Sequence, residues 1–194
     1  MITQKISVLK YLCLIGLLSL FMGCSSPAIT PNRVPFERPR GGIHLIQNVP
    51  FFPQEDHYCG PAALASLLTY YGHPTTQDEI AQSIYLPQHV GTLSMDLLLY
   101  AKAKGLDTQV IEGNLNLLKS EIDQRHPIVV FLNLGLKTFP RGHFIIVIGY
   151  DEQAQTIFAH SGREAELPIP YDQFLTAWGK TGFFALHVNP QRPT

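Results

Sequence analysis

The sequence has few cysteines, few charged residues and little imbalance of charge. Three cysteines in 194 residues are too few for a fold built on disulfides. Charged residues make up 15% of the chain, below the roughly 25% of an average soluble protein. The formal net charge is −1, so the chain lacks the basic surface that nucleic-acid-binding proteins use, and we expect no nucleic-acid partner. The length and the 45% of hydrophobic residues suit one domain with its own core.

The sequence also lacks a hydrophobic run long enough for a membrane-spanning helix. The apolar stretch at residues 11–22 has twelve residues, whereas a membrane span needs about 20. It follows Lys5 and Lys10 and ends at Gly23 and Cys24, an order typical of a secretory signal.

The end of this stretch, residues 20–24, resembles a bacterial lipoprotein lipobox, in which the cysteine is lipidated and becomes the first residue. This resemblance implies a signal peptide at residues 1–23 and a lipid on Cys24. With Ser25 following, it implies an anchor in the bacterial cell envelope, at the outer membrane facing the periplasm. An ordinary cleaved signal or a short membrane anchor is the alternative.

Residues 24–42 are predicted to form a lipidated N-terminus and a tether. Four prolines at intervals of four residues favour an extended spacer, and no apolar period is visible. The remaining residues, 43–194, are predicted to form one α+β domain, with N-terminal helices packed on a C-terminal antiparallel sheet. We expect helices at residues 59–72, 76–84, 94–105, 115–122 and 171–178, and strands at 43–46, 127–134, 143–150, 156–160 and 182–188.

If Cys13 is removed with the signal and Cys24 carries lipid, Cys59 is the one free thiol of the mature chain. Its expected place is the start of the first long helix, where backbone N–H groups and the helix dipole favour a thiolate nucleophile. A small buried core residue is the structural alternative. Gly60 and Pro61 favour a tight helix start.

The segment at residues 53–64 reads PQEDHYCGPAAL and resembles the active-site segment of C39 peptidases, a family of the papain-like clan. This resemblance implies a papain-like cysteine peptidase fold. It also implies that Gln54 and the backbone N–H of Cys59 donate hydrogen bonds to the oxyanion of the reacting carbonyl. The implied substrate is a peptide or protein, cleaved after Gly-Gly in family members that trim leaders.

A cysteine nucleophile needs a base, and His143 is the candidate among eight histidines. It stands at the beginning of the apolar strand expected at residues 143–150, which matches the family layout of a sheet histidine facing the helix cysteine. We expect a thiolate–imidazolium pair. The other histidines are predicted to be solvated or packed.

The third catalytic residue is where the sequence departs from the family. An Asp or Asn is expected on the following strand, to orient the imidazole. Residues 156–162 contain no such group, and His160 or Ser161 stands nearest the expected position. Asp151 lies at the far end of the His143 strand. A backbone or hydroxyl group, a Cys–His dyad, or loss of activity are the three explanations left open.

No metal-ligand spacing or phosphate-binding loop is present, so we expect no cofactor.

Two further functions stay open. The sequences around Cys59 and His143 also resemble phytochelatin synthase, which implies a γ-glutamylcysteine dipeptidyl transferase or glutathione hydrolase. The third hypothesis is a peptide-binding lipoprotein without catalytic activity on a peptidase fold. The sequence leaves the oligomeric state open.

Overall fold

The computed structural model describes residues 42–54, 57–85 and 92–189. Their elements, in chain order, are β1 (Ile43–Leu45), α2 (Cys59–Tyr70), α3 (Gln77–Ile84), α4 (Ser94–Ala103), β2 (Thr108–Glu112), α5 (Leu115–Asp123), β3 (Ile128–Asn133), β4 (Gly142–Asp151), β5 (Thr156–Ser161), β6 (Glu164–Pro170), α6 (Tyr171–Gly179) and β7 (Phe184–Val188). The signal peptide, Cys24 and almost all of the tether lie outside the described residues.

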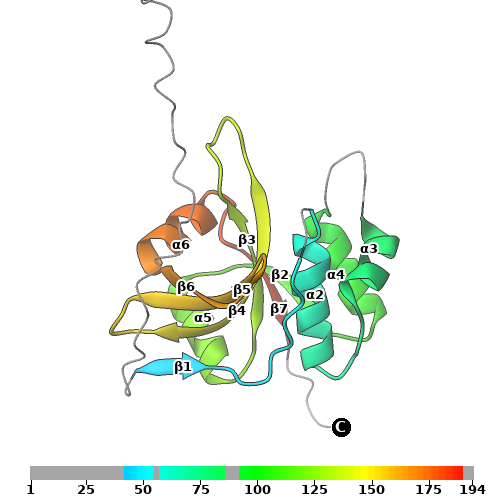
Figure 1. The fold of residues 1–194 in the computed structure, drawn as a ribbon, viewed down its shortest axis with the longest axis horizontal. Helices are drawn as coiled ribbons and strands as arrows, with labels where there is room; N and C mark the ends of the chain where they lie inside the picture. The colour runs from blue at the N-terminus through cyan, green and yellow to red at the C-terminus, as the bar shows by residue number, and fades with distance from the viewer. Residues whose placement is uncertain (1–41, 55–56, 86–91, 190–194) are drawn as a thin grey trace, which may run out of the picture.

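Within the described residues, seven strands form one antiparallel sheet, which confirms the predicted α+β class. The strand order is β2-β7-β3-β4-β5-β6, and β1 pairs with the far end of β4. In Figure 1, α2, α3 and α4 stand together on one side of the molecule, while the sheet lies on the other side with α5 and α6.

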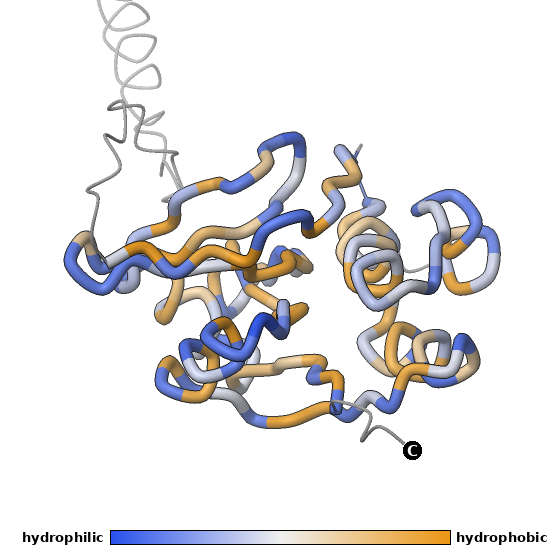
Figure 2. Tube along the Cα trace, turned by 90° about the horizontal axis from the view of Figure 1, so that it is seen from below, coloured by the Kyte–Doolittle hydropathy of each residue, from blue (hydrophilic) through white to orange (hydrophobic). Residues whose placement is uncertain are grey.

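The central strands are apolar because helices cover the sheet on both faces. β3 and β4 are buried at nearly every position, as is expected of strands with two covered faces. α2 packs on β3, β4 and β5, while α5 and α6 also contact β3. In Figure 2, hydrophobic stretches of the trace run through the interior, and many of the outer bends are hydrophilic.

α2 is buried along most of its length because it lies between the sheet and the helices α3 and α4. Pro61 is tolerated in its first turn, where backbone N–H groups have no partner inside the helix. α3 begins with a capping box: Thr76 Oγ1 accepts from Glu79 N at 3.2 Å, and Thr76 N donates to Glu79 Oε2 at 3.1 Å.

The two strands that the sequence analysis did not predict, β2 and β6, are the edges of the sheet. Both are partly exposed, so their apolar pattern is weak. β6 also contains Pro168 and Pro170, which an edge strand tolerates because its outer side needs no ladder hydrogen bonds. α4 begins at Ser94 as predicted, and the residue before it, Leu93, makes no side-chain capping hydrogen bond.

Candidate active site

Cys59 is the first residue of α2 and is partly buried. Burial is the largest influence on the thiol and raises its pKa above the ordinary value. Hydrogen bonding with the backbone of Phe144, Gly60 and Cys59 itself acts in the opposite direction, as expected at a helix start. Burial therefore favours the neutral thiol over the thiolate.

The start of α2 lies directly against the residue that follows His143. A Cβ atom added at Gly60 would stand 3.4 Å from Phe144 Cδ2 and 3.2 Å from Thr92 Cβ. The hydrogen bonding between the Cys59 thiol and the Phe144 backbone agrees with this close approach. The helix thus carries the candidate nucleophile to the beginning of β4, where the candidate base is located.

His143 is the second residue of β4, and its Nε2 lies 2.9 Å from Ser161 Oγ at the end of β5. Burial lowers the pKa of His143 to about 4, and the nearby positive charge of Arg141 acts in the same direction. With Nε2 engaged by Ser161, Nδ1 is the ring nitrogen left to take a proton from a thiol. The raised thiol pKa and the lowered imidazole pKa favour a neutral pair over the thiolate–imidazolium pair that the sequence analysis expected.

Of the two candidates for the orienting residue, Ser161 contacts His143 and His160 has another role. His160 is buried; its Nδ1 accepts from Glu166 N at 3.1 Å, so its Nε2 carries the proton and donates to Val49 O at 3.0 Å. Both ring nitrogens of His160 therefore form hydrogen bonds with the backbone. Burial also lowers the pKa of His160, which keeps the ring neutral.

A serine orients the ring but does not fix its tautomer. A carboxylate only accepts hydrogen bonds, so it holds the proton on the facing ring nitrogen, whereas a hydroxyl both donates and accepts. Asp151, the acid on the same strand as His143, is the last residue of β4; its Oδ1 accepts from the backbone N–H groups of Gln153 and Ala154.

Gln54 is tied to the same end of the sheet. Its backbone N–H donates to Gly162 O at 3.1 Å, in the turn that joins β5 to β6. Gln54 and Ser161 also line one small cavity of about 10 Å³, which has room for about one water molecule. His57, between Gln54 and Cys59, has a left-handed backbone with φ of 77°, an uncommon conformation for a non-glycine residue.

Asn133, at the end of β3, holds the loop that leads to the candidate base, and the sequence analysis did not single it out. Its side chain is 8% exposed, and Oδ1 accepts from Gly135 N and Arg141 N, both at 2.9 Å. These bonds close the loop that leads into Gly142 and His143. The available signal was a polar residue inside the apolar run of residues 127–134.

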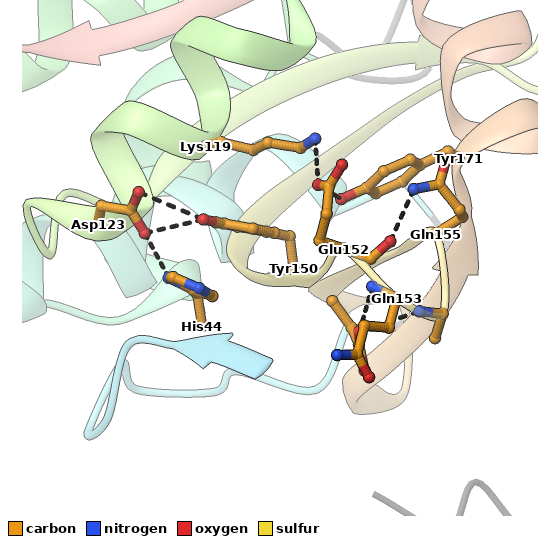
Figure 3. Close-up of polar contacts among 10 residues, drawn as sticks. His44, Lys119, Asp123, Tyr150, Glu152, Gln153, Gln155 and Tyr171 are labelled. Carbon is orange, nitrogen blue, oxygen red and sulfur yellow. Dashed lines mark hydrogen bonds and ion pairs between the residues drawn. The ribbon is translucent and has the colours of Figure 1, made fainter. Parts of the chain in front are cut away.

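A polar cluster at the opposite end of β4 is separate from this site (Figure 3). Tyr150 Oη donates to both Asp123 carboxylate oxygens at 3.0 and 3.2 Å, and His44 Nδ1 lies 2.5 Å from the same carboxylate. These contacts join β1, α5 and β4. Burial, followed by the hydrogen bond with Asp123, raises the pKa of Tyr150 to about 12 and keeps the phenol neutral.

The described part of the chain contains neither a candidate metal site nor a candidate membrane-spanning helix. Among residues 42–54, 57–85 and 92–189, no three His, Cys, Asp or Glu side chains are grouped so that they could hold a metal ion. In the same residues, no helix has the length and hydrophobicity needed to cross a bilayer.

Comparison with known families gives a match over most of the described residues. Residues 46–186 match the Peptidase_C39 like family. The chain belongs to this family. None of the curated proteins matches it.

Solved structures confirm that this C39-like chain has a papain-like fold. A protein from Bacillus anthracis described as a C39-like peptidase has a TM-score of 0.62 at 17% identity, covering 78% of this chain and 99% of that one. The peptidase domain of Streptococcus ComA, a bi-functional ABC transporter, has a TM-score of 0.60 at 23% identity, covering 74% and 99%. A double-glycine motif protease from an AMS/PCAT transporter, in complex with its leader peptide, has a TM-score of 0.59 at 20% identity, covering 78% and 96%.

Proposed function

We propose that this C39-like protein is a cysteine peptidase in which Cys59 attacks a peptide carbonyl. The observation that carries the proposal is the position of Cys59: it begins α2, and its thiol interacts with the backbone of Phe144, next to His143. The family and the shared fold support the same reaction class.

In the proposed mechanism, His143 Nδ1 takes the thiol proton as Cys59 Sγ bonds to the carbonyl carbon. The oxyanion receives hydrogen bonds from the Cys59 backbone N–H and the Gln54 side-chain amide. His143 then returns the proton to the leaving amine. Water hydrolyses the thioester, with His143 accepting its proton, and the free thiol is restored. Because burial favours the neutral form of both groups, proton transfer accompanies attack.

A peptide substrate is supported by the leader-peptide complex of the double-glycine protease that shares this fold. Cleavage after Gly-Gly is therefore the first specificity to test. The experiment compares wild type, Cys59→Ala and Cys59→Ser on a peptide library, with intact mass measured after acid quenching. We expect cleavage and a thioester adduct with wild type alone. A wild-type protein that gives neither product nor adduct contradicts the proposal.

Peptide binding without turnover is the second candidate function. It is favoured by the serine that contacts His143 in place of a carboxylate and by the raised thiol pKa. Binding of equal strength to wild type and Cys59→Ala, without any acyl-enzyme, supports this alternative. A glutathione assay on the same proteins tests the dipeptidyl transferase alternative.

We further propose that Cys24 carries a lipid that anchors the protein at the outer membrane, facing the periplasm. The lipobox-like segment at residues 20–24 supports this proposal. Metabolic labelling with a fatty acid, followed by membrane fractionation, should give label and membrane association in wild type but not in Cys24→Ala. Equal labelling of both proteins contradicts it.

A further inference from the structure

A cavity of about 320 Å³ opens beside the candidate active site, on the side of β4 that pairs with β3. The cavity is lined by residues of α4, the sheet, the loop between β3 and β4 and the segment after α6, and those that carry the argument are Ser94, Phe131, Pro140, Gly142, Lys180 and Phe184. Its volume lies at the lower end of the range of about 300–1,000 Å³ found for small-molecule sites.

The strand that carries His143 borders this cavity through Gly142. Gly142 precedes His143 on β4, and it pairs with Asn133 of β3, which also lines the cavity. Ser94 also lines the cavity and begins α4, two residues after Thr92, which lies against the Gly60 position beside Cys59. A peptide whose carbonyl lies at Cys59 therefore has a flanking side chain within reach of the cavity.

The lining of the cavity is largely apolar, and packing holds its two phenylalanine rings in place. The rings of Phe131 and Phe184 meet edge to face at 6.3 Å between centroids. Gly142 leaves room for the Phe131 ring, since a Cβ atom there would lie 2.6 Å from Cζ. Exposed apolar side chains continue outside the cavity next to Ser94 and Pro140: Leu93 is 49% exposed, Met95 56% and Phe139 78%.

The lining residues include one charged side chain, Lys180, and no carboxylate. Lys180 Nζ donates to Gly135 O at 2.9 Å, which holds it at the loop between β3 and β4. A cationic substrate side chain would meet this ammonium without a counter-charge. An apolar or aromatic side chain would replace water against the two phenylalanine rings.

We propose that this cavity is a specificity subsite for a large apolar or aromatic substrate residue flanking the scissile bond. The proposal rests on the proposed peptidase function and names its substrate class. A subsite of this size and lining distinguishes the chain from an enzyme that requires glycine at every position near the bond. Filling an apolar pocket distinguishes substrates by about 10-fold or more in kcat/KM.

The test uses the full chain and peptides in which one position at a time, on both sides of the scissile bond, is Gly, Leu, Phe or Lys. We expect one position where Phe or Leu exceeds Gly by at least about 10-fold in kcat/KM and where Lys is disfavoured. In Ser94→Phe, which fills the cavity from α4, the Phe/Gly ratio at that position should fall toward one. Ser120→Phe, on the exposed surface of α5, is the matched control and should keep the wild-type ratio.

The possible results separate the two proposals. Cleavage with glycine preferred at every position overturns the subsite while the peptidase function stands, and this result needs no variant. A Phe/Gly ratio that is unchanged in a folded Ser94→Phe protein also overturns the subsite. If wild type cleaves no peptide and forms no thioester, the peptidase function fails and the subsite proposal fails with it.

Discussion

Ser161 is the residue whose replacement tests the site most directly, because its hydroxyl is the group that contacts His143 Nε2, at 2.9 Å. Ser161→Ala removes one hydrogen bond between uncharged groups, which contributes about 1 kcal/mol. We therefore expect kcat/KM to fall about 5-fold, since 1.36 kcal/mol corresponds to a factor of ten. The loss is moderate because a serine does not stabilise an imidazolium by charge.

Ser161→Asp should act in the opposite direction. A carboxylate accepts from Nε2–H, so it leaves Nδ1 free as the base, and a charged hydrogen bond contributes about 1.5–3 kcal/mol. We expect kcat/KM at neutral pH to rise several-fold. A nearby negative charge also favours the imidazolium, so the His143 pKa should rise from about 4 toward its ordinary value.

The assay is the pH dependence of kcat/KM for wild type and the variants, on one peptide that wild type cleaves. The base must be neutral, so wild-type activity should fall as the pH decreases through about 4. The acid limb of Ser161→Asp should lie at higher pH. Ser66→Ala is the matched control, because Ser66 lines the same small cavity and donates instead to Ala62 O at 3.0 Å.

Two results would refute this reasoning. One is an acid limb in Ser161→Asp that coincides with the wild-type limb, because a carboxylate that contacts the base must change its pKa. The other is an equal effect of Ser161→Ala and Ser66→Ala on kcat/KM in folded proteins, which would mean that the cavity matters and the contact with His143 does not.

Three further predictions follow from burial and packing. The rate of Cys59 alkylation by iodoacetamide should still increase above pH 9, because burial raises the thiol pKa; a plateau from pH 5 to 8 would instead indicate a thiolate–imidazolium pair. Gly149→Ala should destabilise the fold by about 1–3 kcal/mol in thermal or urea unfolding, because the new Cβ would lie 2.6 Å from His44 O of β1; an unchanged midpoint contradicts this contact. Glu121→Ala should lower the free energy of unfolding by about 1–3 kcal/mol, because buried Glu121 Oε2 lies 3.0 Å from His126 Nδ1 and 3.1 Å from His187 Nε2. The exposed control Glu112→Ala should change the free energy of unfolding far less.

The sequence predicted the elements whose local signals agree with their tertiary environment. β3 and β4 are apolar along their length because both faces are covered, and α3 has its capping box in four residues. The edge strands β2 and β6 lack such a signal. β2 pairs with β7, which is distant in sequence, and β6 pairs with β5 across a turn. The apolar periodicity within β2 or β6 does not indicate this pairing.

The site shows the same limit. The position of Cys59 at a helix start is a local property, and Gly60-Pro61 indicated it. The choice between His160 and Ser161 depends on which strand face each occupies, and the register of β4 with β5 shifts between Val147 and Gly149. A shift of this kind changes which side chain points toward His143, and counting residues does not predict it.

The effect of burial on the two pKa values could not be predicted from residue types either. A helix N-terminus and a neighbouring histidine favour a thiolate, and the sequence contains both. Desolvation acts in the opposite direction for both groups, and its size depends on how much of the chain packs around them. The extent of this packing is known only from the folded structure.

The turn between β5 and β6 links two parts of the proposed chemistry that are far apart in sequence. Its Gly162 carbonyl holds the backbone of Gln54, and the residue before it, Ser161, contacts His143. A displacement of this turn would move the oxyanion donor and the imidazole together. The energetic effects of substitutions at Gln54 and Ser161 should therefore be coupled and not additive, and a change in the length of this one turn would tune both at once.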